Sequence, residues 1–328
     1  MTSFVSREPR AFRFGVSVPP PADLTQWVEA VRRVEGLGYD VILVSDHLTG
    51  RTGGQLGPIP AMVAAAAAST TLRLGALVLA NDFRHPLVLA KELASVDVMS
   101  GGRLELGLGA GSLASDYEQS GIALDSAGVR IERLGEAIQI IRKAMGPTPF
   151  SFPGKHYNVS EYDGFPKPVQ LPSPPLLVGG GGKRILRLAA EQADIVDINL
   201  QLQGGRIVPN RTILAGEELD AMLEHVRTCA GERMDGIELS HRAFHVDVSR
   251  NRAEAIARAS QRFEAPEWRI VETPYALIGS TESIVEDLLR SRERWGLSYV
   301  IVGPEAIDNF APVVAALGTQ ARPMSPSA

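Results

Sequence analysis

The amino-acid sequence predicts an α/β protein that forms a single TIM-type (β/α)8 barrel with insertions, and two observations lead to this prediction. Short runs rich in Val, Ile and Leu alternate with longer amphipathic stretches along the 328 residues. This alternation favours a parallel sheet, and eight such units in about 300 residues match a barrel. No shift in composition marks a domain boundary, so residues 1–328 are expected to form one domain. A doubly wound open sheet is the alternative, with fewer strands expected in one domain.

Each predicted element follows from its hydrophobic period. In the first helix, Leu24, Trp27 and Val31 share one face, Asp23 is a suitable N-cap and Gly38 a suitable stop. The expected strands are Phe12–Val18, Asp40–Val44, Arg73–Leu79, Arg103–Gly107, Leu176–Val178, Asp194–Ile198, one within Ile237–Val248, and Tyr299–Val302. The expected helices are Asp23–Leu37, Pro58–Ser69, Pro86–Met99, Ile131–Ala144, Lys183–Gln192, Leu214–Cys229, Arg252–Phe263 and Thr281–Trp295.

Two segments interrupt the alternation. Residues 146–175 are rich in proline without a helical period, and Phe150–Val159 within them is expected to form a hairpin. Residues 201–212 are a second, shorter interruption, and the tail from about Gly318 is expected to fray. Long connections are often functional lids, and the sequence leaves open whether these two are lids or surface ornaments.

Composition argues against several classes of partner. The net charge is −5 and no cluster of Lys or Arg runs along one segment, so no nucleic-acid partner is expected. Cys229 is the single cysteine, which excludes an internal disulfide and argues against a cysteine metal site. The longest apolar stretch, Pro60–Ser69, is too short to span a bilayer. We therefore expect a cytoplasmic protein that acts on a small molecule, without a metal and without a membrane contact.

The active site of a TIM barrel lies at the C-terminal ends of its strands. Ser45-Asp46-His47 follows the second strand, where a histidine can act as acid or base near neutral pH. Asp46 could hold a ring nitrogen, contact a cofactor, or simply cap the turn. His85 precedes Pro86 at a helix start, so a capping or packing role is favoured for it. His241 and His245 lie in a strand-like segment, which does not favour a metal site.

Glycines follow the fourth and fifth strands. Gly107–Ser112 lacks the third glycine of a dinucleotide fingerprint and is more typical of the mouth of a pocket for a flat ring. Gly179–Gly182 leads into a helix that begins with Lys183 and Arg184. Exposed N–H groups at a helix N-terminus bind anions, so this turn is predicted to hold a phosphate. Ser112 has no histidine partner nearby in sequence, so a hydrolase triad is not supported.

These motifs, in their order, resemble those of the luciferase-like monooxygenase superfamily, and in particular its actinobacterial branch that uses coenzyme F420, a deazaflavin. The resemblance covers roughly Phe12 to Val302. Its motifs are Phe14-Gly15-Val16, Gly38-Tyr39-Asp40 before Ser45-Asp46-His47, Leu74-Gly75 before Phe83-Arg84-His85-Pro86, Ser100-Gly101-Gly102-Arg103 before Gly107-Leu108-Gly109, Gly179–Gly182 before Leu186-Arg187-Leu188-Ala189-Ala190, Ala193-Asp194, and Ile278-Gly279-Ser280.

The resemblance implies a barrel with a flavin or deazaflavin at its C-terminal mouth and His47 as the catalytic proton donor. It also implies a bulge with a non-proline cis peptide at Leu77-Val78 that supports the ring. The residues that it assigns to cofactor binding are Asp46, Leu77, Val78, Ala80, Asn81, Ala110, Gly111, Ser115, Gly180, Gly181, Gly182, Arg184 and Ile185, the last five around the phosphate.

One departure bears on the substrate. Sugar-phosphate dehydrogenases of this group carry a catalytic glutamate where Ser112 stands here, and Asp116 is offset from that position by about one helical turn. The predicted function is F420-dependent hydride transfer to or from a small organic substrate. The alternatives are an FMN-dependent monooxygenase fed by a reductase, and a non-catalytic binder of flavin or deazaflavin. The family further implies a homodimer and, for turnover, a flavin or F420 reductase.

Overall fold

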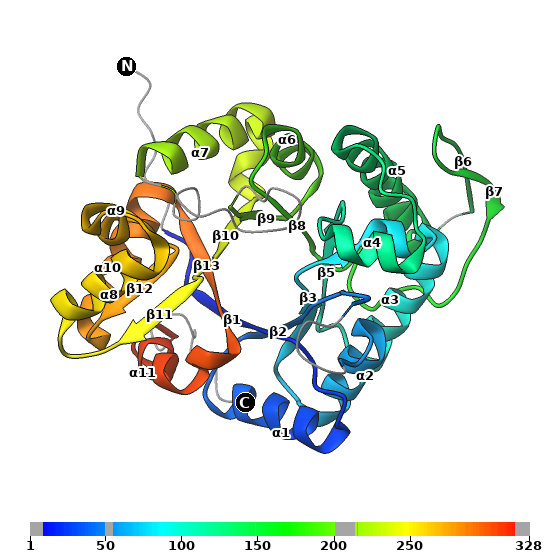
Figure 1. The fold of residues 1–328 in the computed structure, drawn as a ribbon. Coiled ribbons are helices and arrows are strands. Elements are labelled where there is room, and N and C mark those ends of the chain that lie inside the picture. Colours follow the sequence, from blue (N-terminus) through cyan, green and yellow to red (C-terminus); the bar gives the residue numbers. More distant parts are fainter. Residues whose placement is uncertain (1–8, 50–54, 148, 201–213, 215, 319–328) are drawn as a thin grey trace.

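The strands of the barrel form one closed parallel sheet (Figure 1). The computed structural model describes residues 9–49, 55–147, 149–200, 214 and 216–318. Around the sheet the strands are β1 (Arg13–Val18), β2 (Val41–Val44), β3 (Arg73–Ala76) continued by β4 (Leu79–Ala80), β5 (Leu104–Gly109), β8 (Leu176–Gly180), β9 (Ile195–Ile198), β10 (Glu238–Arg242) and β13 (Leu297–Val302). Pairing of β3 with β5 and of β13 with β1 closes the ring. The predicted barrel is confirmed, and the open-sheet alternative is wrong.

Helices follow the strands and cover the outside of the barrel (Figure 1). The predicted ones are present as α1 (Leu24–Gly36), α2 (Pro58–Ala68), α3 (Pro86–Ser100), α5 (Ala127–Met145), α6 (Lys183–Gln192), α7 (Gly216–Ala230), α8 (Arg252–Phe263) and α10 (Thr281–Trp295). Helix α1 begins where the Asp23 carboxylate accepts the N–H of Gln26 at 3.0 Å, as its predicted cap requires. Local capping and periodicity therefore set most of the element boundaries.

Several elements have no counterpart in the predictions. They are the helices α4 (Ala114–Ser120), α9 (Glu267–Glu272) and α11 (Ile307–Gly318), the strands β11 (His245–Val248) and β12 (Ala276–Gly279), and three short 3₁₀ turns, Asn81–Phe83, Gly231–Gly236 and Pro304–Ala306. The region Ile237–Val248 contains two strands, β10 in the barrel and β11 paired with β12 in a separate parallel ribbon. Helix α11 was not anticipated because Pro312 lies inside it, and proline argues against a helix interior.

A bulge separates β3 from β4. Gly75 pairs with Glu105 and Leu79 pairs with Leu108. Between these two pairs the β3–β4 segment advances by four residues and β5 by three, so β3–β4 contains one extra residue. The bulge contains the Leu77-Val78 peptide bond, which is cis as expected for this position. The extra residue changes the direction of the strand just before its C-terminal end, where the site lies.

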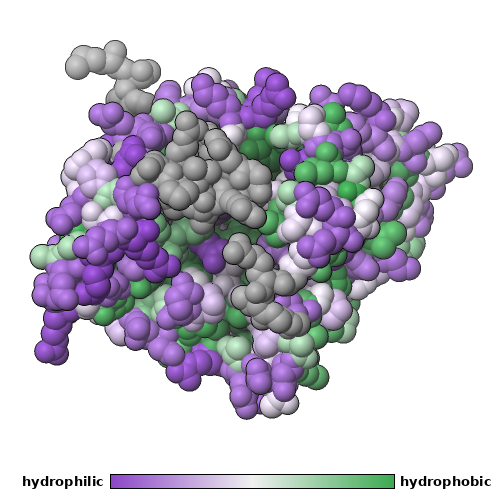
Figure 2. Space-filling view, in the orientation of Figure 1, coloured by the Kyte–Doolittle hydropathy of each residue, from purple (hydrophilic) through white to green (hydrophobic). Residues whose placement is uncertain are grey.

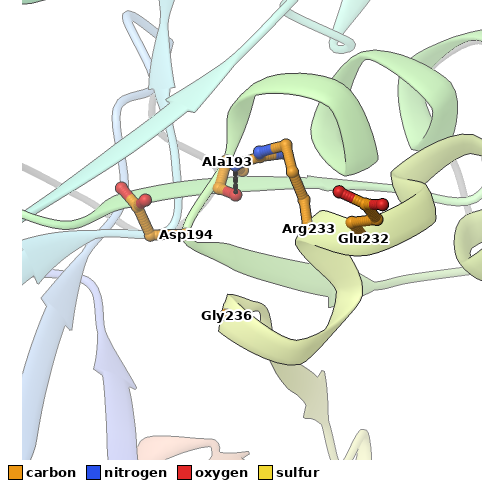
Figure 3. A pocket seen from close by; sticks show the side chains of 5 residues that line it. All are labelled: Ala193, Asp194, Glu232, Arg233 and Gly236. Atoms are coloured by element: carbon orange, nitrogen blue, oxygen red, sulfur yellow. Dashed lines mark hydrogen bonds between the residues drawn. The ribbon is translucent and has the colours of Figure 1, made fainter.

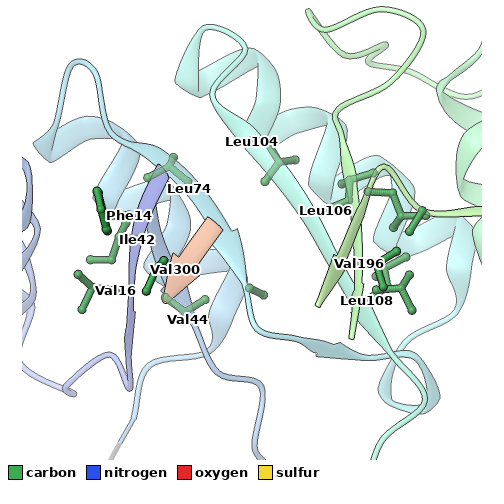
Figure 4. Packing of buried hydrophobic residues seen from close by; sticks show 14 of the residues in the cluster. Phe14, Val16, Ile42, Val44, Leu74, Leu104, Leu106, Leu108, Val196 and Val300 are labelled. Atoms are coloured by element: carbon green, nitrogen blue, oxygen red, sulfur yellow. The ribbon is translucent and has the colours of Figure 1, made fainter. Parts of the chain in front are cut away.

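Apolar side chains pack on both faces of the barrel sheet, and a third, separate cluster lies around α8, α9 and β12. The largest cluster lies between the strands and the surrounding helices, and Figure 4 shows Phe14, Ile42, Leu104 and Val196 among its members. A smaller cluster fills the barrel interior, formed by Val41, Leu43, Leu177, Ile195, Tyr299 and Ile301, with Leu77 and Val78 packed against it. Burying apolar side chains on both sides of the sheet explains why a strand such as β2 (Val41–Val44) is a continuous apolar run rather than an alternating one.

The described part of residues 146–175 contains the expected hairpin, β6 (Phe150–Pro153) and β7 (Asn158–Tyr162), which projects beside α5 (Figure 1). Residues 201–212 and the tail after Gly318 lie outside the described residues.

In Figure 2 hydrophilic residues gather along the edge formed by α8, α9 and α10, where ion pairs such as Arg258–Glu254 and Arg252–Asp287 occur. Among the described helices, none is both long enough and apolar enough to cross a membrane.

Candidate functional site

His47 lies just after β2, at the C-terminal mouth of the barrel. Its Nδ1 is 2.9 Å from Oδ2 of Asp116, a carboxylate whose side chain is 3% exposed, on helix α4. The His47 side chain is 45% exposed. Because the carboxylate is engaged by Nδ1, the opposite ring nitrogen, Nε2, is left for a ligand, and no described residue bonds to it. Nδ1 is therefore the ring nitrogen that the described protein engages, and the exposed imidazole keeps Nε2 available as a donor or acceptor.

Asp46 has a different role from His47. Arg84 binds both of its carboxylate oxygens, at 2.6 and 3.0 Å, and the N–H of Ala80 donates to it at 3.0 Å. Such a bidentate pair is directional as well as strong. The Asp46 carboxylate thus fixes the start of the loop after β4, next to the bulge. The predicted contact of Asp46 with a cofactor stays a prediction, and Arg84 was not anticipated as its partner.

The bulge presents an apolar surface at the top of the barrel interior. Leu77 and Val78 are partly exposed and rest on the interior cluster. Ala80 and Asn81 follow directly and are buried, and the side-chain amide of Asn81 donates to the hydroxyl of Tyr157 at 3.2 Å. Of this predicted group, Leu77 and Val78 therefore offer a platform for a flat ring, whereas Asn81 is held from outside by the hairpin.

The hairpin turn that carries Tyr157 is fixed to the barrel. The carboxylate of Glu136 on α5 accepts the backbone N–H groups of Lys155, His156 and Tyr157 at 2.8 to 3.1 Å. The ring of Tyr157 also meets the edge of His85 at 5.5 Å between centroids. His85 itself caps α3, because its Nδ1 accepts the N–H of Leu87. This is the capping role that the sequence predicted for it. The hairpin adjoins the site through Asn81 rather than being a detached ornament.

The glycine-rich end of β5 accommodates protein groups at close range. A Cβ on Gly107 would overlap the Ala76 carbonyl of the bulge, and one on Gly111 would overlap the Tyr117 hydroxyl. Arg130 of α5 donates to the carbonyls of Ala110, at 3.0 Å, and of Gly111. These contacts fix the loop that carries the predicted ring-edge residues Ala110 and Gly111.

Ser115 completes that edge of the mouth. Its hydroxyl is 3.3 Å from the hydroxyl of Thr49, which follows His47. The structure therefore brings Ser115 to the same loop as His47, although the two residues are far apart in the chain. Ser112, where the resemblance implied a glutamate in sugar-phosphate dehydrogenases, is exposed.

Helix α6 begins directly after the glycine turn of β8. Its N-cap is Gly182, where no side chain caps the helix and where an added Cβ would meet open space. The first turn of the helix contains no acidic residue. The side chain of Arg184 is exposed, and its guanidinium lies next to Gly128 at the start of α5. Gly180 packs against Ile185. An uncapped helix N-terminus with a nearby cation fits an anionic group.

Two buried titratable groups lie near the β9–β10 side of the barrel. Burial raises the pKa of the Asp197 carboxyl to about 6, although hydrogen bonds from Ser240 and Asn199 and the charge of Arg242 oppose the rise. Burial lowers the pKa of His241 to about 4, with the nearby Pro274 carbonyl only partly offsetting this effect. Neither ring nitrogen of His241 completes a hydrogen bond within the described residues. Its buried, neutral ring is a core group.

A pocket lies at the other end of the barrel. Ala193, Asp194, Glu232, Arg233 and Gly236 line it, at the N-terminal end of β9 (Figure 3). Arg233 donates to the carbonyl of Ala193 at 2.9 Å, so it supports the chain there. This end of a TIM barrel serves stability, and the chemistry occurs at the opposite mouth.

Comparison with known protein families matches residues 11–299 to the luciferase-like monooxygenase family. The chain belongs to this family. One protein with a similar sequence is the 5,10-methylenetetrahydromethanopterin reductase of Archaeoglobus fulgidus. It is 27% identical to this chain over an alignment that covers 75% of this chain and 68% of the relative. The F420-dependent glucose-6-phosphate dehydrogenase of Amycolatopsis mediterranei is 29% identical over 75% of this chain and 70% of the relative.

Solved structures of luciferase-like proteins share the same barrel. The coenzyme F420-dependent tetrahydromethanopterin reductase of Methanopyrus kandleri superposes with a TM-score of 0.73, at 18% identity, over 94% of this chain and 99% of that one. This likeness shows the fold alone. The family match over residues 11–299 confirms the resemblance expected from the ordered motifs.

Several residues that contact the predicted site were missed in the sequence or left without a role there, among them Arg130 and Thr49. Asp116, Tyr157 and Arg84 each contact a predicted site residue. Asp116 is 69 positions from His47 and Tyr157 is 76 positions from Asn81. No periodicity or motif links such distant positions, because closure of the barrel brings them together. Only Arg84 carried a signal, since it lies within one of the family-like motifs.

Proposed function

We propose that this protein is a coenzyme F420-dependent oxidoreductase that transfers a hydride between the deazaflavin and a small organic substrate. The observation that carries the proposal is His47, whose Nε2 is unengaged by described residues at the mouth of the barrel beside the Leu77–Val78 bulge. The F420 dependence of the Amycolatopsis dehydrogenase and of the Methanopyrus reductase supports the choice of cofactor.

The residues present fit a deazaflavin or flavin. Leu77 and Val78 offer an apolar, partly exposed platform for a flat ring. The uncapped N-terminus of α6 at Gly182, with Arg184 nearby, suits the phosphate of the cofactor's side chain. In this assignment Gly180, Gly181 and Ile185 shape the phosphate turn.

Each residue has a defined task during turnover. The deazaflavin, when bound, supplies or accepts the hydride. His47 holds the proton at Nε2 and delivers it to the substrate, or takes it back in the reverse direction. Asp46 keeps Ala80 and Arg84 in place, and Ala110, Gly111 and Ser115 line the ring edge. The protein thus orients the reactants and excludes water.

The setting of the enzyme follows from the same family. A single cysteine fits a reducing cytoplasm. Val98 and Met99 of α3, together with Val169 and Leu171, are exposed apolar residues, which supports a homodimer through this face. Light scattering of the purified protein tests the dimer. An F420 reductase would regenerate the reduced cofactor.

Fluorescence titration of the purified protein with coenzyme F420 and with FMN, side by side, tests the cofactor. We expect F420 to bind more tightly, because the proposal rests on F420-dependent relatives. Tighter binding of FMN, with oxygen consumption in the presence of a flavin reductase, would replace the proposal by the monooxygenase alternative. Binding of F420 without turnover of any alcohol or carbonyl compound in a broad panel would favour a non-catalytic binder.

His47→Ala tests the proton donor. We expect turnover with the best substrate of that panel to fall by roughly 10²- to 10⁴-fold, the usual contribution of a positioned acid–base group. The F420 dissociation constant should change little, because the platform and the phosphate turn remain. His85→Ala is the matched control, since His85 caps α3 and its Nδ1 is already engaged. Equal turnover in the His47 variant and the wild type would remove His47 from the mechanism.

A further inference from the structure

We propose that Asp116 is the positioning residue for His47, fixing the ring so that Nε2 is the atom that exchanges the proton. The inference rests on the proposed function, because it deepens the role of His47 there. Asp116 lies on α4 (Ala114–Ser120) and His47 follows β2, so the contact joins two different strand ends.

The carboxylate of Asp116 is wholly committed to the loop that carries His47. Oδ2 is 2.9 Å from Nδ1 of His47. Oδ1 accepts the N–H of Leu48 at 3.1 Å, the N–H of Thr49 at 2.8 Å and the Thr49 hydroxyl at 2.7 Å. One buried side chain therefore holds both the ring and the backbone that follows it.

This set of hydrogen bonds is unusual for an acidic residue in the first turn of a helix. Asp116 is the third residue of α4, a position whose acidic side chain commonly reaches back to its own N-cap. Here the N-cap, Leu113, offers no side-chain cap, and the four hydrogen bonds that the carboxylate makes within the described residues all go to residues 47–49. The side chain serves the neighbouring loop, and the helix alone does not explain it.

The charge of Asp116 determines the ring's tautomer. Burial would raise its pKa, but hydrogen bonds from His47 and Thr49 outweigh burial and lower the pKa below its ordinary value. The carboxylate is therefore ionised at neutral pH and can only accept, so Nδ1 must carry the proton. Nε2 is then the lone-pair site of the neutral ring and the donating site of the protonated ring.

This arrangement balances the proton step. During reduction of a carbonyl substrate, the hydride from the reduced deazaflavin forms a C–H bond and the π-electron pair moves to oxygen. That oxygen takes the proton from Nε2, and the ring becomes neutral with its Nδ1 proton still held by Asp116. Water returns a proton to Nε2. Oxidation of an alcohol runs the same transfers in reverse.

Long-range ¹H–¹⁵N spectra of the protein labelled at its six histidines provide a readout that needs no substrate. The signal lost in His47→Ala identifies the ring. In the wild type at alkaline pH, we expect the neutral ring to carry its proton on Nδ1. In Asp116→Asn and Asp116→Ala, the ring nitrogens should move toward the tautomer mixture of a freely exposed histidine, and turnover should fall on the order of 10²-fold with unchanged F420 affinity.

Two matched variants separate positioning from general disturbance. Thr49→Val removes one bond to Asp116 but leaves the contact with His47. Asp82→Asn alters another fully buried carboxylate, held by Tyr117 and Arg133 without touching His47. Both should keep the wild-type nitrogen pattern of His47.

An unchanged His47 pattern in folded Asp116→Asn and Asp116→Ala protein would overturn the inference. So would a loss of turnover in these variants that is matched by Asp82→Asn. Failure of the proposed function is distinguishable, because it would appear as full activity of His47→Ala or as absent F420 binding, whatever the nitrogen spectra show.

Discussion

Gly107→Ala is expected to destabilise the barrel by about 4 kcal/mol or more, the range in which single substitutions are exceptional. A Cβ at this position would overlap the backbone carbonyl of Ala76, far closer than the 3.0 Å below which real Cβ contacts essentially do not occur. The obstacle is backbone, because the three nearest atoms all belong to the main chain of Ala76 at the end of β3. No rotamer change can relieve the overlap.

Urea denaturation followed by tryptophan fluorescence and circular dichroism measures the effect. Gly36→Ala in α1 is the control, since an added Cβ there meets nothing within 4 Å and alanine favours a helix. Gly75→Ala is an intermediate case, because its Cβ would lie 2.9 Å from the flexible tip of Leu43. The expected order of denaturation midpoints is Gly36→Ala highest, Gly75→Ala next and Gly107→Ala lowest, with insolubility counted as the extreme of that order. A midpoint of Gly107→Ala equal to that of Gly36→Ala would contradict the bulge geometry.

Glu105→Gln is expected to cost about 3–5 kcal/mol, the usual effect of breaking a buried ion pair. Glu105 lies at the N-terminal end of β5 with its side chain 1% exposed. It binds Arg13, accepts from Nε of Arg73 at 2.7 Å and accepts from the Tyr299 hydroxyl at 3.3 Å. The glutamine keeps the shape of the side chain but leaves two largely buried guanidinium groups with less compensating charge.

Two further variants grade this prediction by the same denaturation measurement. Glu238→Gln should lower the free energy of unfolding by less, because its partner Arg13 still has the carboxylate of Glu105 as a second partner. Glu191→Gln breaks an exposed pair with Arg187 of similar length, 2.7 Å, and should produce no resolvable change. If Glu105→Gln and Glu191→Gln have the same denaturation midpoint, the charged cluster of Glu105, Arg13 and Arg73 does not stabilise the barrel. The folded variant should still bind F420, since the cluster lies away from the mouth.

Local signals in the sequence predicted the barrel. Several barrel strands, such as β2 (Val41–Val44) and β13 (Leu297–Val302), are short runs of mostly apolar residues, and helices such as α1 have one apolar face. Both patterns depend only on neighbours along the chain. Rules for strand order then closed the sheet without further information. The same signals failed for β11, β12 and α11, where a proline and a short ribbon outside the barrel broke the period.

The sequence by itself also predicted which strand ends carry chemistry. His47 and the glycine turn before Lys183 were predicted because parallel strands bring their C-terminal ends to one face. The ordered motifs added the bulge at Leu77-Val78. These inferences need only the position of a residue relative to its own strand.

Only the tertiary structure decided how the site residues act on one another. Asp116 reaches His47 across 69 positions, and Asp46 turns out to hold Arg84 and Ala80. Gly107 is required by the carbonyl of Ala76 on a neighbouring strand. Hydrogen bonds and overlaps act within a few ångströms in space, and the sequence period of a strand or helix carries no record of which distant residue will arrive there.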